Sequence, residues 1–215
     1  MRVAPTLELE QVAWDSGIAV VCGMDEVGRG AWAGPVTVGA VVPGRCDLPG
    51  VRDSKQLSRR QRELIVVEIE RWAHAIGIGH ATASECDALG MTAAQRLAGE
   101  RALHALSQQG FSPGRIILDG NHDYLKLGSR VMTVIKGDAI SLACAAASIV
   151  AKVTRDQWMI AESIRYPGFD FDSNVGYPAP AHRRALAKSG PTAIHRRTWA
   201  FMDRLNQPAL AFDEP

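Results

Sequence analysis

Apolar runs alternate with helical patterns along the chain, and five of these runs predict β-strands. The first covers residues 18–24, and a second, over residues 35–42, follows after one short glycine-rich connection. Because strands joined so closely pair with each other, we expect these two to be antiparallel. The remaining predicted strands cover residues 76–83, 115–119 and 131–135.

Helical periodicity fills most of the other segments. Ser58 has the position of an N-cap, and the helical pattern after it ends at Gly77. Two shorter helices, a long helix rich in small residues and a basic helix are expected to begin at Ser84, Thr92, Asp138 and Ala181. Strands followed by strand–helix alternation predict an α/β fold, with a mixed five-stranded sheet flanked by helices and a small C-terminal helical extension.

The composition of the 215-residue chain is that of a folded globular protein. Hydrophobic residues make up 47% and charged residues 22% of the sequence, which excludes a mainly disordered chain. The pattern predicts one domain over residues 18–204, preceded by a segment of residues 1–17 and followed by a tail, residues 205–215, whose composition permits disorder. No apolar heptad or interface stripe is visible, so we expect a monomer.

Nothing in the sequence indicates export or a membrane anchor. The longest apolar run, residues 139–151, carries two serines and is too short to cross a bilayer, and the N-terminal residues lack the apolar core of a signal peptide. The four cysteines lie 24, 40 and 58 residues apart, without the spacing of a metal site or a disulfide framework. We therefore expect reduced thiols and a cytoplasmic protein.

The net charge of +1 conceals two basic segments. Residues 52–62 hold five basic side chains against one acidic one, and residues 176–204 hold six against one. Such segments favour a polyanionic partner that meets one face of the protein, although two solvated helix surfaces would give the same pattern.

Four acidic residues lie where the predicted strands end. Asp25 and Glu26 follow the first strand, Asp119 ends the fourth, and Asp138 follows the fifth and opens the long helix. Carboxylates gathered at one edge of a sheet suit a hard divalent cation, Mg²⁺ or Mn²⁺. Adjacent strand residues point to opposite faces, so both members of the first pair reach one site only if the pleat ends before Gly28. Taken singly, each acid would equally fit a turn or an N-cap.

A glycine-rich segment follows the first acidic pair, and further motifs follow along the chain. They are Asp25-Glu26-Val27-Gly28-Arg29-Gly30, Asp53-Ser54-Lys55-Gln56-Leu57-Ser58, Leu118-Asp119-Gly120, Lys136-Gly137-Asp138, and Gly176-Tyr177 with His182. In this combination the sequence resembles ribonuclease HII, the bacterial type 2 ribonuclease H. The similar region runs from about residue 18 to residue 204. One departure is the pair Pro178-Ala179, which stands where the family usually has Gly-Thr.

The resemblance implies a ribonuclease H-like fold and a divalent-metal endonuclease. Its substrates would be the RNA strand of RNA–DNA hybrids and ribonucleotides embedded in duplex DNA. We interpret the chemistry as two-metal hydrolysis that leaves a 5′-phosphate and a 3′-hydroxyl. The implied catalytic and metal-binding residues are Asp25, Glu26, Asp119 and Asp138.

Substrate contacts are implied at the glycine segment, at a tyrosine and at basic residues. Gly28, Arg29 and Gly30 would contact the 2′-hydroxyl and a nearby phosphate, and Tyr177 would recognise the RNA–DNA junction. The basic residues expected to neutralise phosphates are Lys55, Arg183 and Arg184.

Three other functions remain open from the sequence. The first is a nuclease of the same fold that acts on DNA alone. The second is metal-free ribonuclease chemistry by paired histidines, with the 2′-oxygen as nucleophile. The third is a module that binds hybrids without cutting them.

Overall fold

The fold is built on a mixed five-stranded sheet, as predicted. The computed structural model describes residues 4–51, 54 and 57–205; the predicted tail beyond residue 205 and Lys55 lie outside the described residues. The strands are β1 (Val21–Val27), β2 (Val36–Val42), β3 (Ala75–Ala81), β4 (Arg115–Asp119) and β5 (Val131–Val134). Their order in the sheet is β3-β2-β1-β4-β5. The β1–β2 and β2–β3 pairs are antiparallel, and the β1–β4 and β4–β5 pairs are parallel.

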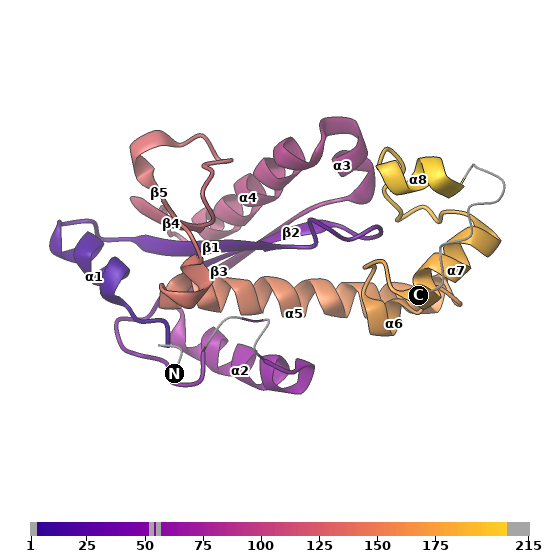
Figure 1. The fold of residues 1–215 in the computed structure, drawn as a ribbon. Coiled ribbons are helices and arrows are strands. Elements are labelled where there is room, and N and C mark those ends of the chain that lie inside the picture. The colour runs from indigo at the N-terminus through magenta and orange to yellow at the C-terminus, as the bar shows by residue number, and fades with distance from the viewer. Residues whose placement is uncertain (1–3, 52–53, 55–56, 206–215) are drawn as a thin grey trace.

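Helices cover both faces of the sheet (Figure 1). On one face, α4 (Met91–Gln108) packs on β2 and β3; on the other, α5 (Leu142–Arg165) crosses β1 and β2. The helix α2 (Arg59–Trp72) packs on the outer side of α5. The smaller helices are α1 (Glu8–Asp15), α3 (Ala83–Leu89), α6 (Phe171–Asn174), α7 (Pro180–Ser189) and α8 (Ala200–Leu205). Together, α6, α7 and α8 form the predicted C-terminal extension. In it, α6 packs on α5, while residues 197 and 198, just before α8, hydrogen-bond to Asp87 of α3 (Figure 1).

Small residues bring α5 very close to the sheet. The part of α5 that faces the sheet is a buried run rich in alanine, as the sequence predicts. A Cβ atom added at Gly23 of β1 would overlap the backbone of Ala143 and Cys144, and one added at Gly39 of β2 would lie 2.5 Å from the Ala147 carbonyl oxygen. The helix backbone therefore lies directly on β1 and β2, which fixes its distance from the strand that carries the first acidic pair.

Several predicted boundaries are wrong. The first strand does not end before Asp25 and Glu26, because both residues pair with β2 as part of β1. The helix after Ser58 has the predicted N-cap, with a capping box to Gln61, but it ends at Trp72 and not at Gly77, which lies in β3. A Cβ at Gly77 would overlap the Ala102 carbonyl, so this glycine permits close packing of α4 instead of ending a helix.

Three helix starts also differ from the prediction. Asp138 does not open the long helix; it lies in a short 3-10 helix, η3 (Gly137–Ala139), and Ser141 is the N-cap of α5. The helices predicted to begin at Ser84 and Thr92 are capped by Thr82 and Gly90. The capping box between Thr82 and Glu85 satisfies both backbone donors, which explains why that helix starts two residues earlier.

The N-terminal helix α1 is fastened to the start of α5. The Glu10 side chain is buried, and its Oε1 accepts hydrogen bonds from Ser141 Oγ (2.6 Å) and from the backbone N–H of Ala143 (2.9 Å). The carboxylate thus satisfies donors in the first turn of α5, where negative charge is favourable. This contact joins the segment before β1 to the helix that follows Asp138.

No helix in the described part of the chain combines the length and apolar character that crossing a membrane requires. All four cysteines are free thiols in the structure.

Candidate metal centre and nucleic-acid interface

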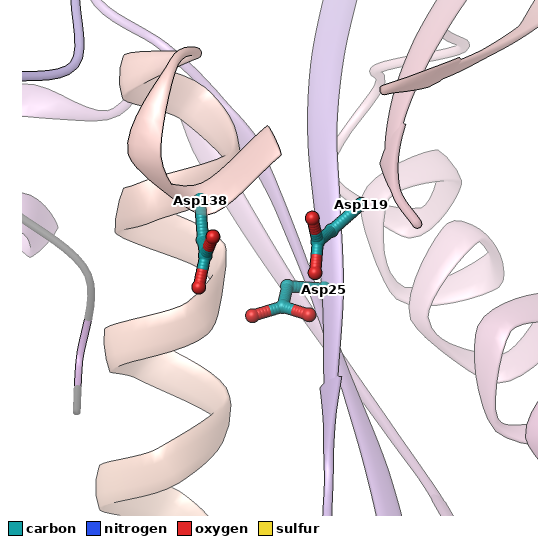
Figure 2. Close-up of side chains that lie close together, drawn as sticks. All are labelled: Asp25, Asp119 and Asp138. Carbon is teal, nitrogen blue, oxygen red and sulfur yellow. The ribbon is translucent and has the colours of Figure 1, made fainter. Parts of the chain in front are cut away.

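Three aspartates from distant parts of the chain meet at one edge of the sheet. Asp25 comes from β1, Asp119 from the last position of β4, and Asp138 from η3; one carboxylate oxygen of each lies within 4.8 Å of the others. Figure 2 shows the three carboxylate groups facing one another in the space between the sheet and α5. Asp25 and Asp138 are each only 5% exposed. The predicted convergence of these three side chains is confirmed.

Strand register and backbone hydrogen bonds place these carboxylates. Met24 pairs with Leu118 in the parallel β1–β4 ladder, so Asp25 and Asp119 are neighbours whose side chains leave the same face of the sheet. Asp119 Oδ1 accepts a hydrogen bond from the Gly137 N–H at 2.6 Å, which ties β4 to the turn that carries Asp138. The Lys136 backbone has φ +58°, and this left-handed residue directs the chain into that turn.

Burial and mutual repulsion disfavour the charged form of this cluster. The pKa of Asp25 is raised well above its ordinary value, first by burial and then by the negative charges of Glu26, Asp119 and Asp138. Burial also raises the pKa of Glu26, although the neighbouring Arg29 guanidinium opposes the shift. Divalent cations would offset these charges, because they attract the ionised carboxylates.

Glu26 lies beside the three aspartates but is not a member of the 4.8 Å group. Alternation along β1 directs it to the side of the strand that faces α4, away from Asp25. Its Oε1 is 3.5 Å from Arg29 Nη1, and its Oε2 is buried without a hydrogen-bond partner among the described residues. The pleat therefore does not end before Gly28, and Glu26 approaches the cluster from its own side of the strand.

A cleft of about 320 Å³ opens beside the acidic residues. Asp25, Glu26 and the loop residues 28–30 line one part of it, and Tyr177 lines another. The sequence predicted each of these residues as part of one site, and the structure brings them together.

Five further residues line the cleft, and none of them was assigned to the site from the sequence. They are Val27, Ser54, Arg62, Ser148 and Lys152. Ser54 Oγ lies 2.9 Å from Ser148 Oγ, while Arg62 Nη1 donates to the carbonyl oxygens of Ser54 and Leu57. Arg62 belongs to the basic segment 52–62, so the charge pattern was a usable signal for it, whereas pairing between Ser54 and Ser148 across 94 residues has no local signal.

The predicted arginines of α7 are not among the residues that line this cleft. Arg183 Nε donates to the Pro178 carbonyl (3.2 Å), and its guanidinium lies 5.4 Å from the Trp32 ring centre. Arg184 is exposed on the same helix. Both lie in the C-terminal extension, so a contact with nucleic acid there would be more distant from the acidic cluster.

Hydrogen bonds from a buried arginine side chain hold the backbone of the glycine loop, residues 28–30. Arg196, which is 0% exposed, donates to the carbonyl oxygens of Gly28 (2.6 Å), Arg29 (2.7 Å) and Gly34 (3.2 Å). In a trans peptide the N–H points opposite to the carbonyl, so the amides of Arg29 and Gly30 point away from Arg196. The loop therefore presents two successive N–H groups on its outer side.

Arg155 makes a second set of such bonds. Its guanidinium is also fully buried, and it donates to the carbonyl oxygens of Pro35 (2.9 Å), Ala33 (3.0 Å) and Val175 (2.9 Å). These bonds join the glycine loop to the segment that precedes Tyr177. Buried hydrogen bonds thus fix the position of Tyr177 relative to the glycine loop.

This mixed sheet, with its carboxylates gathered between the central strands and a long helix, defines a nuclease of the ribonuclease H class. The sequence model of the family described as ribonuclease HII matches residues 22–202. The chain is 50% identical over 193 residues to ribonuclease HII of Streptomyces avermitilis (89% of this chain, 82% of the relative), and 46% identical over 202 residues to ribonuclease HII of Synechococcus sp. strain JA-3-3Ab (92% and 89%).

Among solved structures, the crystal structure of ribonuclease H2 from Pyrococcus horikoshii is similar. Its TM-score is 0.71 at 28% identity, over 86% of this chain and 96% of that one. The chain belongs to the ribonuclease HII family, and the resemblance predicted from its motifs is confirmed.

Proposed function

We propose that this member of the ribonuclease HII family is a divalent-metal-dependent endonuclease that hydrolyses the RNA strand of RNA–DNA hybrids and incises duplex DNA at embedded ribonucleotides. The observation that carries the proposal is the meeting of three buried aspartates within 4.8 Å, beside a cleft that also contains the glycine loop and Tyr177. One region thus combines oxygen ligands for cations with groups suited to ribose and phosphate.

The donor set fits Mg²⁺ or Mn²⁺. Asp25, Asp119 and Asp138 supply closely spaced carboxylate oxygens. Glu26, whose charge acts on Asp25 and whose Oε2 has no hydrogen-bond partner among the described residues, would be a fourth donor from the other side of β1. Bound cations would supply a lowered pKa for a coordinated water and would stabilise negative charge on the departing 3′-oxygen. The products expected of this chemistry carry a 5′-phosphate and a 3′-hydroxyl.

The protein's own groups would orient the substrate. The outward N–H groups of Arg29 and Gly30 are suited to a phosphate or to the 2′-hydroxyl that distinguishes RNA from DNA. Arg196 binds the carbonyl oxygens of Gly28 and Arg29, which belong to the same peptide groups as these N–H groups, so the donors are held in place before the substrate binds. Tyr177, on the other side of the cleft, would pack against the next sugar, where a deoxyribose leaves room.

Basic residues would bind the backbone without reading sequence. Arg62 and Lys152 line the cleft itself, and both also approach Asp156, at 3.9 and 2.8 Å. We assign Arg183 and Arg184 to phosphates further along the duplex, and Lys55, which lies outside the described residues, to phosphate binding as well.

A cleavage assay separates this function from the alternatives. The substrates are a DNA duplex with one embedded ribonucleotide, its all-DNA counterpart and a long RNA–DNA hybrid, each with Mg²⁺, with Mn²⁺ and with excess chelator. We expect metal-dependent incision of the first and third substrates and none of the second. Cutting of the all-DNA duplex would indicate a DNA nuclease. Activity in chelator with a cyclic phosphate product would indicate histidine chemistry, and binding without cleavage would indicate a hybrid-binding module.

Arg29→Ala is expected to lower kcat/KM on the single-ribonucleotide duplex by about tenfold, as loss of one charge-assisted hydrogen bond to the ribonucleotide would. Binding of all-DNA duplex, measured by fluorescence anisotropy, should change less, because the arginine lies in the loop proposed to recognise ribose. Arg71→Ala is the matched control: Arg71 is another exposed arginine paired with a nearby glutamate, and it lies at the end of α2. Equal losses of cleavage and DNA binding in Arg29→Ala would refute the assigned role of the loop.

Tyr177→Ala is expected to reduce cleavage at an isolated ribonucleotide by about tenfold or more, and cleavage of a long hybrid by less. The ring is proposed to recognise the sugar that follows the ribonucleotide, and in a long hybrid that sugar is itself a ribose. Single-turnover rates on the two substrates measure the difference. If neither rate changes, Tyr177 does not belong to the site.

A further inference from the structure

Two histidines that no step above uses form a buried pair beside the substrate cleft. His182, in α7, and His195 are 0% and 1% exposed, and their Nε2 atoms lie 2.9 Å apart. The rings of Phe169 and Phe171 pack around both imidazoles. Two polar rings can be buried at low cost only if their nitrogens form hydrogen bonds. Here all of these hydrogen bonds donate in the same direction along the pair.

The partners of the outer nitrogens fix where the protons are. His195 Nδ1 lies 2.9 Å from the Thr192 backbone nitrogen and 2.8 Å from the Thr192 hydroxyl. The hydroxyl can donate or accept, but the backbone N–H can only donate, so Nδ1 carries no hydrogen and neutral His195 is protonated at Nε2. His182 Nδ1 lies 2.8 Å from the Tyr177 carbonyl oxygen, which can only accept, so neutral His182 is protonated at Nδ1. The His195 Nε2–H therefore donates to His182 Nε2. The result is a one-way chain from Thr192 through His195 and His182 to Tyr177.

Both rings are held in the neutral form that this chain requires. Burial lowers the pKa of His195 to about 3, with the charges of His182 and Arg197 adding to the effect, and burial also lowers the pKa of His182. A second proton on either ring would place two donors against each other within the chain.

The chain ends on the backbone of Tyr177. Its carbonyl oxygen accepts from both His182 Nδ1 and the Ala179 N–H (2.8 Å), and its own N–H donates to the Asn174 carbonyl (3.0 Å). Pro178 between them has no N–H to offer, so the histidine supplies a donor that the local backbone cannot. The five-residue spacing from Tyr177 to His182 allows this contact, since the ring on the first turn of α7 reaches back over the N-cap.

The other end of the chain is tied to the glycine loop. His195 forms an antiparallel bridge with Ala33, and the next residue, Arg196, donates its N–H to the Trp32 carbonyl at 2.9 Å. The Arg196 side chain holds the carbonyls of Gly28 and Arg29. The histidine pair thus connects the two elements between which a ribonucleotide and its neighbour would lie.

We propose that His182 and His195 are positioning residues whose one-way hydrogen-bond chain holds Tyr177 against the glycine loop and so sets the preference for a ribonucleotide followed by a deoxyribonucleotide. This proposal rests on the role proposed above for Tyr177. Neither histidine touches the substrate; both act through the backbone of the tyrosine.

The first test reads the protons directly and needs no substrate. Long-range ¹H–¹⁵N correlation spectra of the whole protein at neutral pH should show His195 as the Nε2–H tautomer and His182 as the Nδ1–H tautomer. The opposite tautomer on either ring, or a charged ring, overturns the chain.

The second test compares two changes at His182. His182→Phe keeps an aromatic ring in the pocket but removes the donor to Tyr177, and we expect about a fivefold to tenfold loss at the isolated ribonucleotide with less than a twofold loss on a long hybrid. His182→Asn places a side-chain N–H where Nδ1–H was and should recover most of the loss. Circular dichroism and thermal melting establish that each variant is folded. If His182→Phe does not fold, the cleavage rates of His182→Asn and His195→Phe on the two substrates are compared instead.

A double-mutant cycle separates positioning from a general effect on the fold. If the histidine acts through the tyrosine, adding His182→Phe to Tyr177→Ala should lower the rate no further. Losses that multiply overturn the proposal. If Tyr177→Ala leaves the preference between substrates unchanged, the role of Tyr177 fails and the proposal fails with it; if Tyr177→Ala abolishes the preference but His182→Phe does not, only the role of the histidines is overturned.

Discussion

Replacing Asp25 by asparagine is expected to lower cleavage by about a thousandfold or more and, in the same protein, to raise the thermal stability of the metal-free state. The loss follows from removing the central carboxylate of the cluster, which costs several kcal/mol of transition-state stabilisation where it holds a cation. The gain follows from the raised pKa of Asp25, caused by burial and by its acidic neighbours. Few changes would move activity and stability so far in opposite directions.

The sign of the stability effect depends on pH. In the folded protein the Asp25 carboxyl group binds its proton more tightly than in the unfolded chain, where its pKa has the ordinary value of 3.8. The protonated group therefore contributes stability at pH values below 3.8, and this contribution is lost as the pH rises through the raised pKa of the folded state. At neutral pH, above the ordinary pKa, the raised pKa of Asp25 destabilises the metal-free folded protein, and asparagine removes that penalty.

Thermal melts in excess chelator measure this effect. At pH 7.5 we expect Asp25→Asn to melt above the unchanged protein, by about 2–4 °C for each kcal/mol gained, and the difference should shrink toward pH 4. Added Mg²⁺ or Mn²⁺ should raise the melting temperature of the unchanged protein more than that of the variant. Asp47→Asn, at an exposed loop position, is the control and should change neither property. A variant that melts lower than the unchanged protein at pH 7.5 would contradict the repulsion described for the cluster.

Gly23→Ala is expected to destabilise the protein by about 3 kcal/mol or more and to abolish most activity. The added methyl group would overlap the backbone of Ala143 and Cys144, and backbone cannot rotate out of the way as a side chain can. Relief requires α5 to move away from β1, and the turn that carries Asp138 immediately precedes this helix. The same displacement would therefore widen the acidic cluster.

Urea denaturation compares this variant with a matched change. Gly30→Ala adds the same methyl group at a position with no atom within 4 Å of the new Cβ and no positive φ. Its free energy of unfolding should change by less than about 0.5 kcal/mol. If Gly23→Ala unfolds at the same urea concentration as Gly30→Ala, β1 and α5 do not pack as closely as described.

The fold and three members of the acidic set could be predicted because they depend on strand ends. Asp119 and Asp138 lie near the ends of apolar runs, and parallel pairing brings such ends to the same edge of the sheet whether or not each boundary is correct to the residue. The first strand shows this tolerance. Asp25 and Glu26 interrupt the apolar pattern, so the sequence predicts that the strand ends before them. Their main-chain pairing with β2 nevertheless makes both residues part of β1.

Other features have no signal within a short window of sequence. Gly77 has the appearance of a helix terminator, and only the proximity of Ala102 in α4 explains its place in a strand. Glu10 and Ser141 form a buried hydrogen bond although 131 positions separate them in the sequence, and no local pattern near either residue predicts it. Long-range partners of buried polar groups are set by tertiary packing, so they must be read from the structure.

The two buried arginines bear on how strongly dissolved salt can weaken binding to nucleic acid. Burial lowers the pKa of Arg196 only to about 10, so it is charged at neutral pH, and neither Arg196 nor Arg155 has a carboxylate within ion-pair distance among the described residues. Their positive field reaches the cleft through protein, where mobile ions cannot gather around the charge and screen it. The number of counterions released from a duplex on binding would therefore underestimate the electrostatic attraction between protein and nucleic acid. Part of that attraction comes from the two buried arginine side chains, which do not contact solvent.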